Sequence, residues 1–302
     1  MSLLLSPLTS QARPLFEFYL DQSGRTLSAY SFIIHCLWSD LFNFYWSVRD
    51  DHFLLFAEYD RCFYMPLPPL GSRDARIVRT CFDWMDAKNP NNAISRIENI
   101  LEAELAFYQA CGLSVSTADS EYLYLRQALM GLQGNRYKTQ RWACNRFEKQ
   151  YCPCIRPYRL LDQAAAMTLF EKWEKGRAMR HPEYIYLKML CDAKLLHRRI
   201  LLDGPKLGMM GLVIEVDEGM VGYTFGFLLN QETFCVVAEV TDLNYTGAAA
   251  YLFRALCKMI PGVRWINVMG DSGLENIRRV KLSYRPEKCV GAYVAQYDRC
   301  GL

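Results

Sequence analysis

The sequence predicts an α+β protein of two domains, each with a mixed, mostly antiparallel sheet flanked by helices. Strand-like runs separated by turn signals occur in both halves of the chain, and apolar residues recur at helical spacing between them. The chain has 302 residues, 51% of them apolar, which is enough for one long domain or two ordinary ones. Prolines and cysteines interrupt the pattern near residue 154, so we expect an N-terminal domain at 1–154 and a C-terminal domain at 155–302.

The first half is expected to contain a short helix, a sheet segment and further helices. Asp50-Asp51 predicts a hairpin turn, and the proline-rich stretch 66–71 ends the sheet segment. Asn92 is the expected N-cap of a helix that ends at Gly112, where positive φ is favourable. The predicted elements are helices at 15–20, 73–87, 93–111 and 138–150, and strands at 42–48, 52–59, 61–65 and 121–125.

The second half begins with helices and continues with three successive strands. The predicted elements are helices at 162–173, 184–197 and 248–259, strands at 209–216, 221–229, 233–239, 263–268 and 289–297, and a basic helical turn near 278–281. This order resembles an acyl-CoA N-acyltransferase domain of the acetyltransferase (GNAT) type. The first half is similar in layout but more divergent. No sequence repeat aligns the halves, so we infer a tandem duplication from the order of elements alone.

Composition and charge limit the class of protein. The net charge is +3, from 35 basic and 32 acidic residues, so any contact with nucleic acid requires a local basic patch. No stretch approaches the roughly 18 consecutive apolar residues of a membrane span, and the start of the chain lacks signal-peptide features. We therefore expect a cytoplasmic protein with reduced cysteines. Cys144, Cys152 and Cys154 lack the paired spacing of a zinc site, so no metal is predicted.

Several enzyme classes lack their motifs in this chain. With four histidines and no Gly-x-Ser-x-Gly, a hydrolytic triad is not expected. The phosphate-binding motifs Walker A and Gly-x-Gly-x-x-Gly are missing from the sequence as well. His35 lies in an apolar run and is predicted to be a core histidine.

A first candidate anion site is the start of the helix at 248–259. Asn244, Gly247 and Ala249 place small residues where backbone N–H groups approach a pyrophosphate, and the helix dipole favours negative charge there. Asn244 stands where acetyltransferases usually carry Gln or Arg. The alternative is a glycine that only permits a tight turn from strand to helix.

A second candidate is the basic helix at 138–150. Lys138, Arg141 and Lys149 fall on one face of this helix, and Arg136 lies just before it. A cationic face beside Trp142 suits a nucleic-acid backbone or a phospholipid head group. The alternative is an ordinary solvated helix surface.

A third candidate lies near the end of the chain. Arg278, Arg279 and Lys281 place three cations within four positions, and Asn267 and Asp271 stand at the preceding strand end. The cations are expected to bind an anionic donor, with the polar pair orienting it. The alternative is a helix C-terminus whose cations complement the dipole.

Two carboxylates are the candidate catalytic groups. Glu239 and Asp242 lie at the end of the predicted central strand of the second sheet. Acyl transfer needs a group that removes a proton from the attacking amine or hydroxyl, and a carboxylate at a strand end is well placed to do so. The alternative is that Glu239 caps the sheet or pairs with a basic residue.

Two blocks of the sequence are specific enough to indicate a family. They are Leu132-x-Gly134-x-Arg136-Tyr-Lys138-x-x-Arg141 and Leu274-x-x-Ile-Arg278-x-x-Lys281-Leu-Ser-Tyr284-x-Pro286. Further matches are Tyr30-Ser-Phe32, Leu37-Trp38, Leu67-Pro-Pro-Leu-Gly71, Asp119-Ser-Glu-Tyr122-Leu-Tyr124, Gly222–Gly226, Glu239, Asp242 and Gly247. With these blocks the chain resembles the C-terminal-domain family of phosphatidylglycerol lysyltransferase, in a short form without the membrane half.

The resemblance implies two tandem GNAT-like folds and transfer of an aminoacyl group from aminoacyl-tRNA to a lipid hydroxyl or another acceptor. In such a site Tyr284 lines the acyl tunnel. The chain departs from the family where Val268-Met269-Gly270 follows Asn267 and where Val240 follows Glu239, since charged residues are usual there. Two alternatives therefore stay open: an acetyl-CoA-dependent N-acetyltransferase, with acyl-CoA as donor, and a non-catalytic binding protein. The expected partners are tRNA and, peripherally, anionic lipid.

Overall fold

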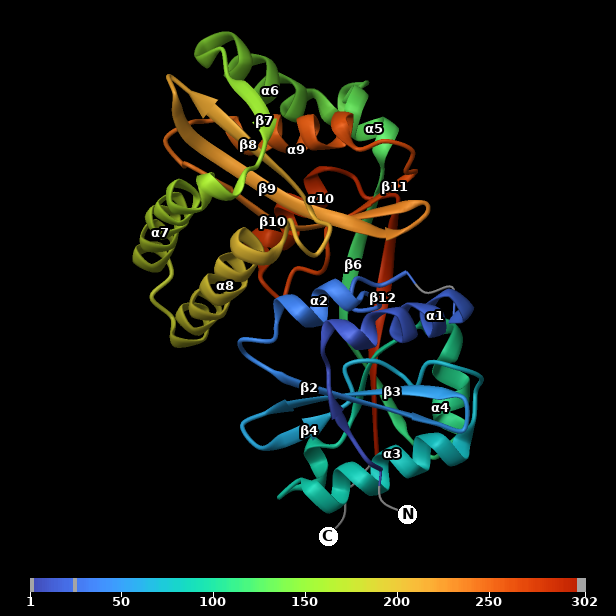
Figure 1. The fold of residues 1–302 in the computed structure, drawn as a ribbon. Helices are drawn as coiled ribbons and strands as arrows, with labels where there is room; N and C mark the ends of the chain where they lie inside the picture. Colours follow the sequence, from blue (N-terminus) through green and yellow to red (C-terminus); the bar gives the residue numbers. More distant parts are fainter. Residues whose placement is uncertain (1–2, 24–25, 298–302) are drawn as a thin grey trace. The chain divides into compact units, whose positions relative to one another are not determined.

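The computed structural model describes residues 3–23 and 26–297, and the chain forms two compact units (Figure 1). Unit 1 holds the chain up to Glu121 and the segment from Val290 onward, and unit 2 holds Tyr122–Cys289. None of the helices in these described residues has the length and apolarity that a membrane span requires.

Unit 1 is built around an antiparallel sheet with the strand order β1-β2-β3-β4. The central strand β3 buries both faces: Phe53 packs with Phe16 of α1, and Phe56 packs with Phe82 of α3. Successive residues of a strand alternate between faces, so the two helices cover opposite sides of this sheet. The elements are β1 (Ser6–Pro7), α1 (Arg13–Ser23), α2 (Phe32–Leu37), β2 (Asn43–Arg49), β3 (His52–Tyr59), β4 (Cys62–Tyr64), α3 (Ala75–Lys88), β5 (Ile97–Ile100), α4 (Leu105–Ala110) and β6 (Ser114–Leu125).

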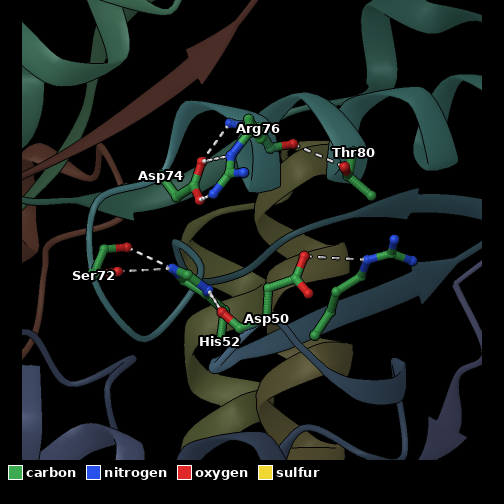
Figure 2. A network of polar contacts seen from close by, with 7 residues as sticks. Asp50, His52, Ser72, Asp74, Arg76 and Thr80 are labelled. Carbon is green, nitrogen blue, oxygen red and sulfur yellow. Dashed lines mark hydrogen bonds and ion pairs between the residues drawn. The ribbon is translucent and has the colours of Figure 1, made fainter.

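Figure 2 shows the polar contacts that fix the β2–β3 turn and the start of α3. Asp74 caps α3, because its carboxylate accepts a hydrogen bond from the Arg76 backbone N–H (2.8 Å) and pairs with the Arg76 guanidinium (2.7 Å). The ring nitrogens of His52 lie 2.5 and 2.7 Å from the carbonyl oxygens of Asp50 and Ser72. This histidine is 3% exposed, so it serves the scaffold of unit 1.

The predicted helix at 93–111 is wrong for residues 93–104, which are not α-helical. Residues 97–100 form β5, which pairs with β12, and only Leu105–Ala110 is α-helical. Ile97 and Ile100 are fully buried in the strand. A spacing of three also fits a helix, so pairing with a strand far away in the sequence decides the outcome. The cap of the short turn at 92–94 is Asn91, not Asn92.

Unit 2 is a sheet with the strand order β6-β11-β10-β9-β8-β7, in which β10 and β11 run parallel. A side chain at Gly222 of β9 would meet Leu252 of α9, whereas the hydroxyl of Tyr223 lies 2.8 Å from His197 of α8. Neighbouring residues of a strand point to opposite faces, so α9 and α8 cover the two sides. The further elements are α5 (Arg126–Gly131), α6 (Lys138–Tyr151), β7 (Cys154–Pro157), α7 (Gln163–Arg180), α8 (Tyr184–Asp203), β8 (Met210–Val216), β9 (Gly219–Asn230), β10 (Thr233–Thr241), α9 (Ala248–Met259), β11 (Trp265–Asn267), α10 (Glu275–Ser283) and β12 (Lys288–Gln296).

The same order of elements occurs twice along the chain. A short strand, two helices, three antiparallel strands, a helix and a strand run from β1 to β5, and again from β7 to β11. The second series begins at β7, close to the expected boundary at 154/155. The compact units divide the chain elsewhere, within β6 and within β12. Residues 122–154 belong to unit 2 because α5 and α6 pack against α9.

Candidate functional site

The candidate site of unit 2 is a cavity where β10 and β11 separate. The two strands pair only from Thr233↔Trp265 to Cys235↔Asn267, and β10 then continues to Thr241. A register shift between Val236 and Ala238 distorts β10 at this point. A cavity of about 350 Å³ opens beside it. Its apolar wall is formed by Val236, Ala238, Phe253, Val268, Ile277 and Val280. We call it the β10–β11 cavity.

Glu239 is the acidic group of this cavity. It lies on β10 opposite Thr224 of β9 and is half-buried. Its carboxylate makes no hydrogen bond or ion pair with the described part of the chain, so the predicted alternative of a paired or capping role finds no support. Burial without a compensating cation raises the pKa of Glu239 from its ordinary value of 4.5 to about 8. A carboxyl group with this pKa exchanges its proton near neutral pH, as a general base must.

Asp242, the second predicted base, is engaged elsewhere. One of its carboxylate oxygens lies 2.5 Å from the Lys172 ammonium, and the other accepts a hydrogen bond from the Asn244 backbone N–H (3.0 Å). The carboxylate thus ties α7 to the turn after β10, and it does not line the cavity. Of the two carboxylates, the geometry favours Glu239 as the reactive one.

The start of α9 lies beside the cavity. Gly247 has φ +98°, and a Cβ there would come within 2.6 Å of the Ala143 carbonyl oxygen and 3.0 Å of Phe147 on α6. Glycine is therefore required both by the backbone conformation and by the close approach of α6. Ala249, two residues on, lines the cavity, whereas Asn244 is exposed outside it. The small residues bring the N-terminal end of a helix, with its partial positive charge, to the cavity wall.

Lys281 shapes the loop after β11. Its ammonium donates to the carbonyl oxygens of Val268 (2.7 Å), Met269 (3.2 Å) and Gly270. With its three protons directed at carbonyls, Lys281 is a structural cation whose stem lines the cavity, and it is not the phosphate clamp that was expected.

The polar pair Asn267 and Asp271 supports the same loop. The Asn267 side chain accepts a hydrogen bond from the Met269 backbone N–H (2.7 Å). Asp271 accepts from the Gly273 backbone N–H (2.9 Å) and from the Tyr122 hydroxyl (2.5 Å). Both side chains are buried, so their polar groups serve the fold of the loop and do not face the cavity.

The remaining residues of the C-terminal block separate into two groups. Tyr284 lines the cavity, and its ring lies 5.2 Å from that of Phe253, edge to face. Burial, with a smaller contribution from the nearby Glu239, raises the pKa of Tyr284, so its hydroxyl stays protonated. Arg278 and Arg279 are exposed on α10 and do not line the cavity.

The basic helix α6 does not present a uniform cationic face. Arg141 is turned inward, where its guanidinium donates to the carbonyl oxygens of Leu132 (2.5 Å) and Gly134 (3.1 Å). These hydrogen bonds hold the turn between α5 and α6. The N–H groups that make them are not available to bind a phosphate. Lys138 and Lys149 are exposed.

Arg136 belongs to a second, larger cavity of about 1040 Å³ in unit 2. Its other cations are Arg126, Lys258 and Arg264, and its lining contains no acidic side chain. We call these four residues and the space between them the basic groove. The Arg126 backbone N–H donates to the Arg264 carbonyl (2.9 Å), and its Nε donates to the Cys257 carbonyl (2.8 Å), next to Lys258.

Sequence reasoning missed three of these four cations because they are dispersed in the chain. Arg126 follows β6, Lys258 ends α9 and Arg264 precedes β11. The antiparallel pairing of β6 with β11 brings Arg126 beside Arg264, and no local pattern signals that pairing. The groove was detectable in sequence only through Arg136.

Comparisons with known proteins concern the fold and the family of the chain. A search of the curated proteins finds no match. Among solved structures, a conserved protein of unknown function from Bacteroides thetaiotaomicron is 23% identical, with a TM-score of 0.86, covering 97% of this chain and 99% of that one. The L-PGS structure from Bacillus licheniformis is 16% identical, with a TM-score of 0.64 and coverages of 96% and 93%. A tandem GNAT protein from the clavulanic acid biosynthesis pathway is 10% identical, with a TM-score of 0.51 and coverages of 99% and 100%.

These structural likenesses show the fold, which is that of two tandem GNAT-like domains, as the order of elements predicts. The family model described as "Phosphatidylglycerol lysyltransferase, C-terminal" matches residues 21–296. The chain therefore belongs to the phosphatidylglycerol lysyltransferase C-terminal-domain family.

Proposed function

We propose that this protein is an aminoacyl transferase that moves an aminoacyl group from aminoacyl-tRNA to the hydroxyl of a lipid or to another nucleophilic acceptor. The observation that carries the proposal is the Glu239 carboxyl, unpartnered among the described residues, in a mostly apolar cavity at the point where two parallel strands separate. The family and its structural neighbours support acyl or aminoacyl transfer in general. The donor and the acceptor are part of the proposal.

The proposed step uses Glu239 as the general base. Its carboxylate takes the proton from the acceptor hydroxyl as the oxygen attacks the ester carbonyl carbon of the donor. A new ester bond forms, the old bond to the terminal ribose oxygen breaks, and that oxygen recovers a proton. The apolar wall excludes water, which would otherwise hydrolyse the ester. The helix start at Ala249 stabilises negative charge next to the cavity.

The basic groove supports RNA as the donor carrier. Four cations in a cavity of about 1040 Å³ whose lining contains no carboxylate attract a phosphate backbone. Like the cavity, the groove belongs to unit 2: α9 runs from Ala249, at the cavity, to Lys258, at the groove. Over that length a helix rises on the order of 14 Å.

A second candidate is an acetyl-CoA-dependent N-acetyltransferase. The specific observation that favours it is the glycine-opened start of α9 beside the cavity, which suits a pyrophosphate. In that case Glu239 would take its proton from an amine. The lack of Gln or Arg at Asn244 counts against a strong pyrophosphate site.

One experiment distinguishes the two candidate functions. Purified protein is incubated with radiolabelled aminoacyl-tRNA or with acetyl-CoA, together with lipid vesicles or an amine mixture, and transferred label is counted. The proposal requires transfer from the charged tRNA that is lost in Glu239→Gln and retained in Glu232→Gln, a matched control at the exposed turn before β10. Transfer from acetyl-CoA alone establishes the second candidate. No transfer from either donor refutes both and leaves a binding protein.

A further inference from the structure

The ends of α7 and α8 that flank their short connection, residues 181–183, carry several strongly exposed apolar side chains. Met179 is 80% exposed, and Tyr184 and Ile185 are each 73% exposed. Leu187 follows at 36%. Figure 1 shows α7 and α8 as neighbouring helices joined by this short connection. We call these four residues the apolar tip. Burying such side chains in a nonpolar phase is favourable, and nothing in the described chain covers them.

The tip does not stabilise the hairpin that carries it. The two helices are anchored by other residues, since Phe170 of α7 and Tyr186, Leu190 and Ile200 of α8 are buried. Tyr186 points inward although its neighbours Ile185 and Leu187 point outward. The exposed apolar side chains are therefore not required for folding, and their place at the adjoining ends of two helices leaves them accessible to a partner.

Cations surround the apolar tip. Between residues 175 and 188 the chain carries Lys175, Arg177, Arg180 and Lys188 but only one acidic residue, Glu183. The Lys188 ammonium lies 5.8 Å from the centre of the Tyr184 ring, so charge and apolar surface are directly adjacent. Farther along the hairpin, the carboxylates of Glu171 and Glu174 lie 3.4 and 3.3 Å from Lys194. These carboxylates lie away from the tip, and residues 175–188 themselves carry four basic side chains against one acidic one, a net positive charge.

We propose that the apolar tip docks on an anionic membrane surface, with Met179, Tyr184 and Ile185 inserted among the head groups and Arg180 and Lys188 facing lipid phosphates. Apolar and aromatic side chains flanked by Lys and Arg are the composition of an interfacial membrane contact. RNA has little apolar surface to offer these side chains. A second copy of the chain would bring a like-charged tip to the same place, which is repulsive.

The membrane contact goes beyond the proposed transfer reaction and does not depend on it. It would place unit 2 at a lipid surface whether the acceptor is a lipid or not. Binding to vesicles and transfer of label are separate measurements, so either idea can fail without the other.

Co-sedimentation with vesicles tests the proposal. The full chain is mixed with vesicles of equimolar phosphatidylglycerol and phosphatidylcholine, or of phosphatidylcholine alone. We expect binding to the anionic vesicles that weakens with salt and is much weaker on the neutral ones. The double variant Met179→Ser/Ile185→Ser should lower the affinity by at least tenfold, because two inserted side chains are lost. Arg180→Gln and Lys188→Gln should each lower it about fivefold.

Matched controls use exposed apolar residues elsewhere in unit 2. Leu161 is 76% exposed and Leu228 is 62% exposed, so Leu161→Ser/Leu228→Ser removes comparable surface away from the hairpin. This control variant should bind vesicles like the unchanged protein, and thermal melts should show both double variants folded. The proposal is overturned if the chain does not bind anionic vesicles, if tip and control variants bind alike, or if light scattering shows that the tip instead mediates self-association.

Discussion

Glu239→Gln is the sharpest perturbation that the structure offers, because it should change rate and stability in opposite directions. The folded protein raises the pKa of this carboxyl from 4.5 to about 8 by burying it. In the unfolded chain the pKa returns to its ordinary value, so between these limits the folded state binds more protons. The free energy of unfolding therefore falls as pH rises from about 4.5 to about 8.

The size of this effect follows from the shift. Each pKa unit corresponds to about 1.4 kcal/mol, so the full shift would cost about 5 kcal/mol above pH 8. Part of the carboxyl faces the cavity and its solvent, so we expect about 2–4 kcal/mol to be realised. Glutamine has the same shape and no charge. Glu239→Gln should match the unchanged protein in stability at pH 5 and exceed it by that amount at pH 9.

The same substitution should lower the transfer rate by roughly 10²–10⁴-fold, because the base is lost. In the unchanged protein, kcat/KM should rise about tenfold per pH unit up to about pH 8 and then level off, since only the ionised carboxylate accepts a proton. Urea unfolding at pH 5, 7 and 9 and initial rates over the same range are the measurements. A stability difference that is equal at all three pH values would refute the burial argument. A variant that keeps its rate would refute the assignment of the base.

Three further predictions concern the supports of the site and the basic groove. Gly247→Val should destabilise the protein by about 3 kcal/mol in urea unfolding, since its Cβ meets the Ala143 carbonyl and its φ is unfavourable; equal stability would show that α6 can move away. Lys281→Met should cost about 1–3 kcal/mol and raise KM, because three half-buried loop carbonyls lose the Lys281 donor; an unchanged melting curve would contradict this role. Arg264→Gln should weaken tRNA binding in filter assays and reduce its salt slope by about 1, whereas Arg198→Gln, on the exposed side of α8, should not; equal effects would exclude the groove as the RNA contact.

Local patterns in the sequence predicted most helices and strands. They failed where hydrogen bonding to a strand far away in the sequence determines the secondary structure. The turn at Asp50-Asp51 is confirmed, with both residues at positive φ. His35 is confirmed as a buried core histidine, since its ring lies 2.9 Å from the Ala29 carbonyl oxygen and burial lowers its pKa to about 4. The helix predicted at 93–111 failed because β12, almost 200 positions away, pairs with β5 there.

The candidate site shows the same division. Glu239 was predicted from its place at a strand end, Ala249 from the small residues at a helix start, and Tyr284 from the family resemblance. All three line the β10–β11 cavity. Lys281 was predicted from charge alone to bind an anion, yet its ammonium is taken up by loop carbonyls. A lysine in the sequence does not show whether the N–H groups of its ammonium already donate hydrogen bonds within the fold.

The sequence by itself determined the family, the order of helices and strands in the second half, and the strand end that carries the candidate base. These follow from periodicity, turn residues and motif spacing, which are local properties of the chain. Only the tertiary structure decided which charged groups are free to act. Lys172 of α7 forms an ion pair with Asp242, whereas no cation of the described residues pairs with Glu239. Whether a carboxylate keeps its proton depends on what folds around it, because desolvation and ion pairing act through space.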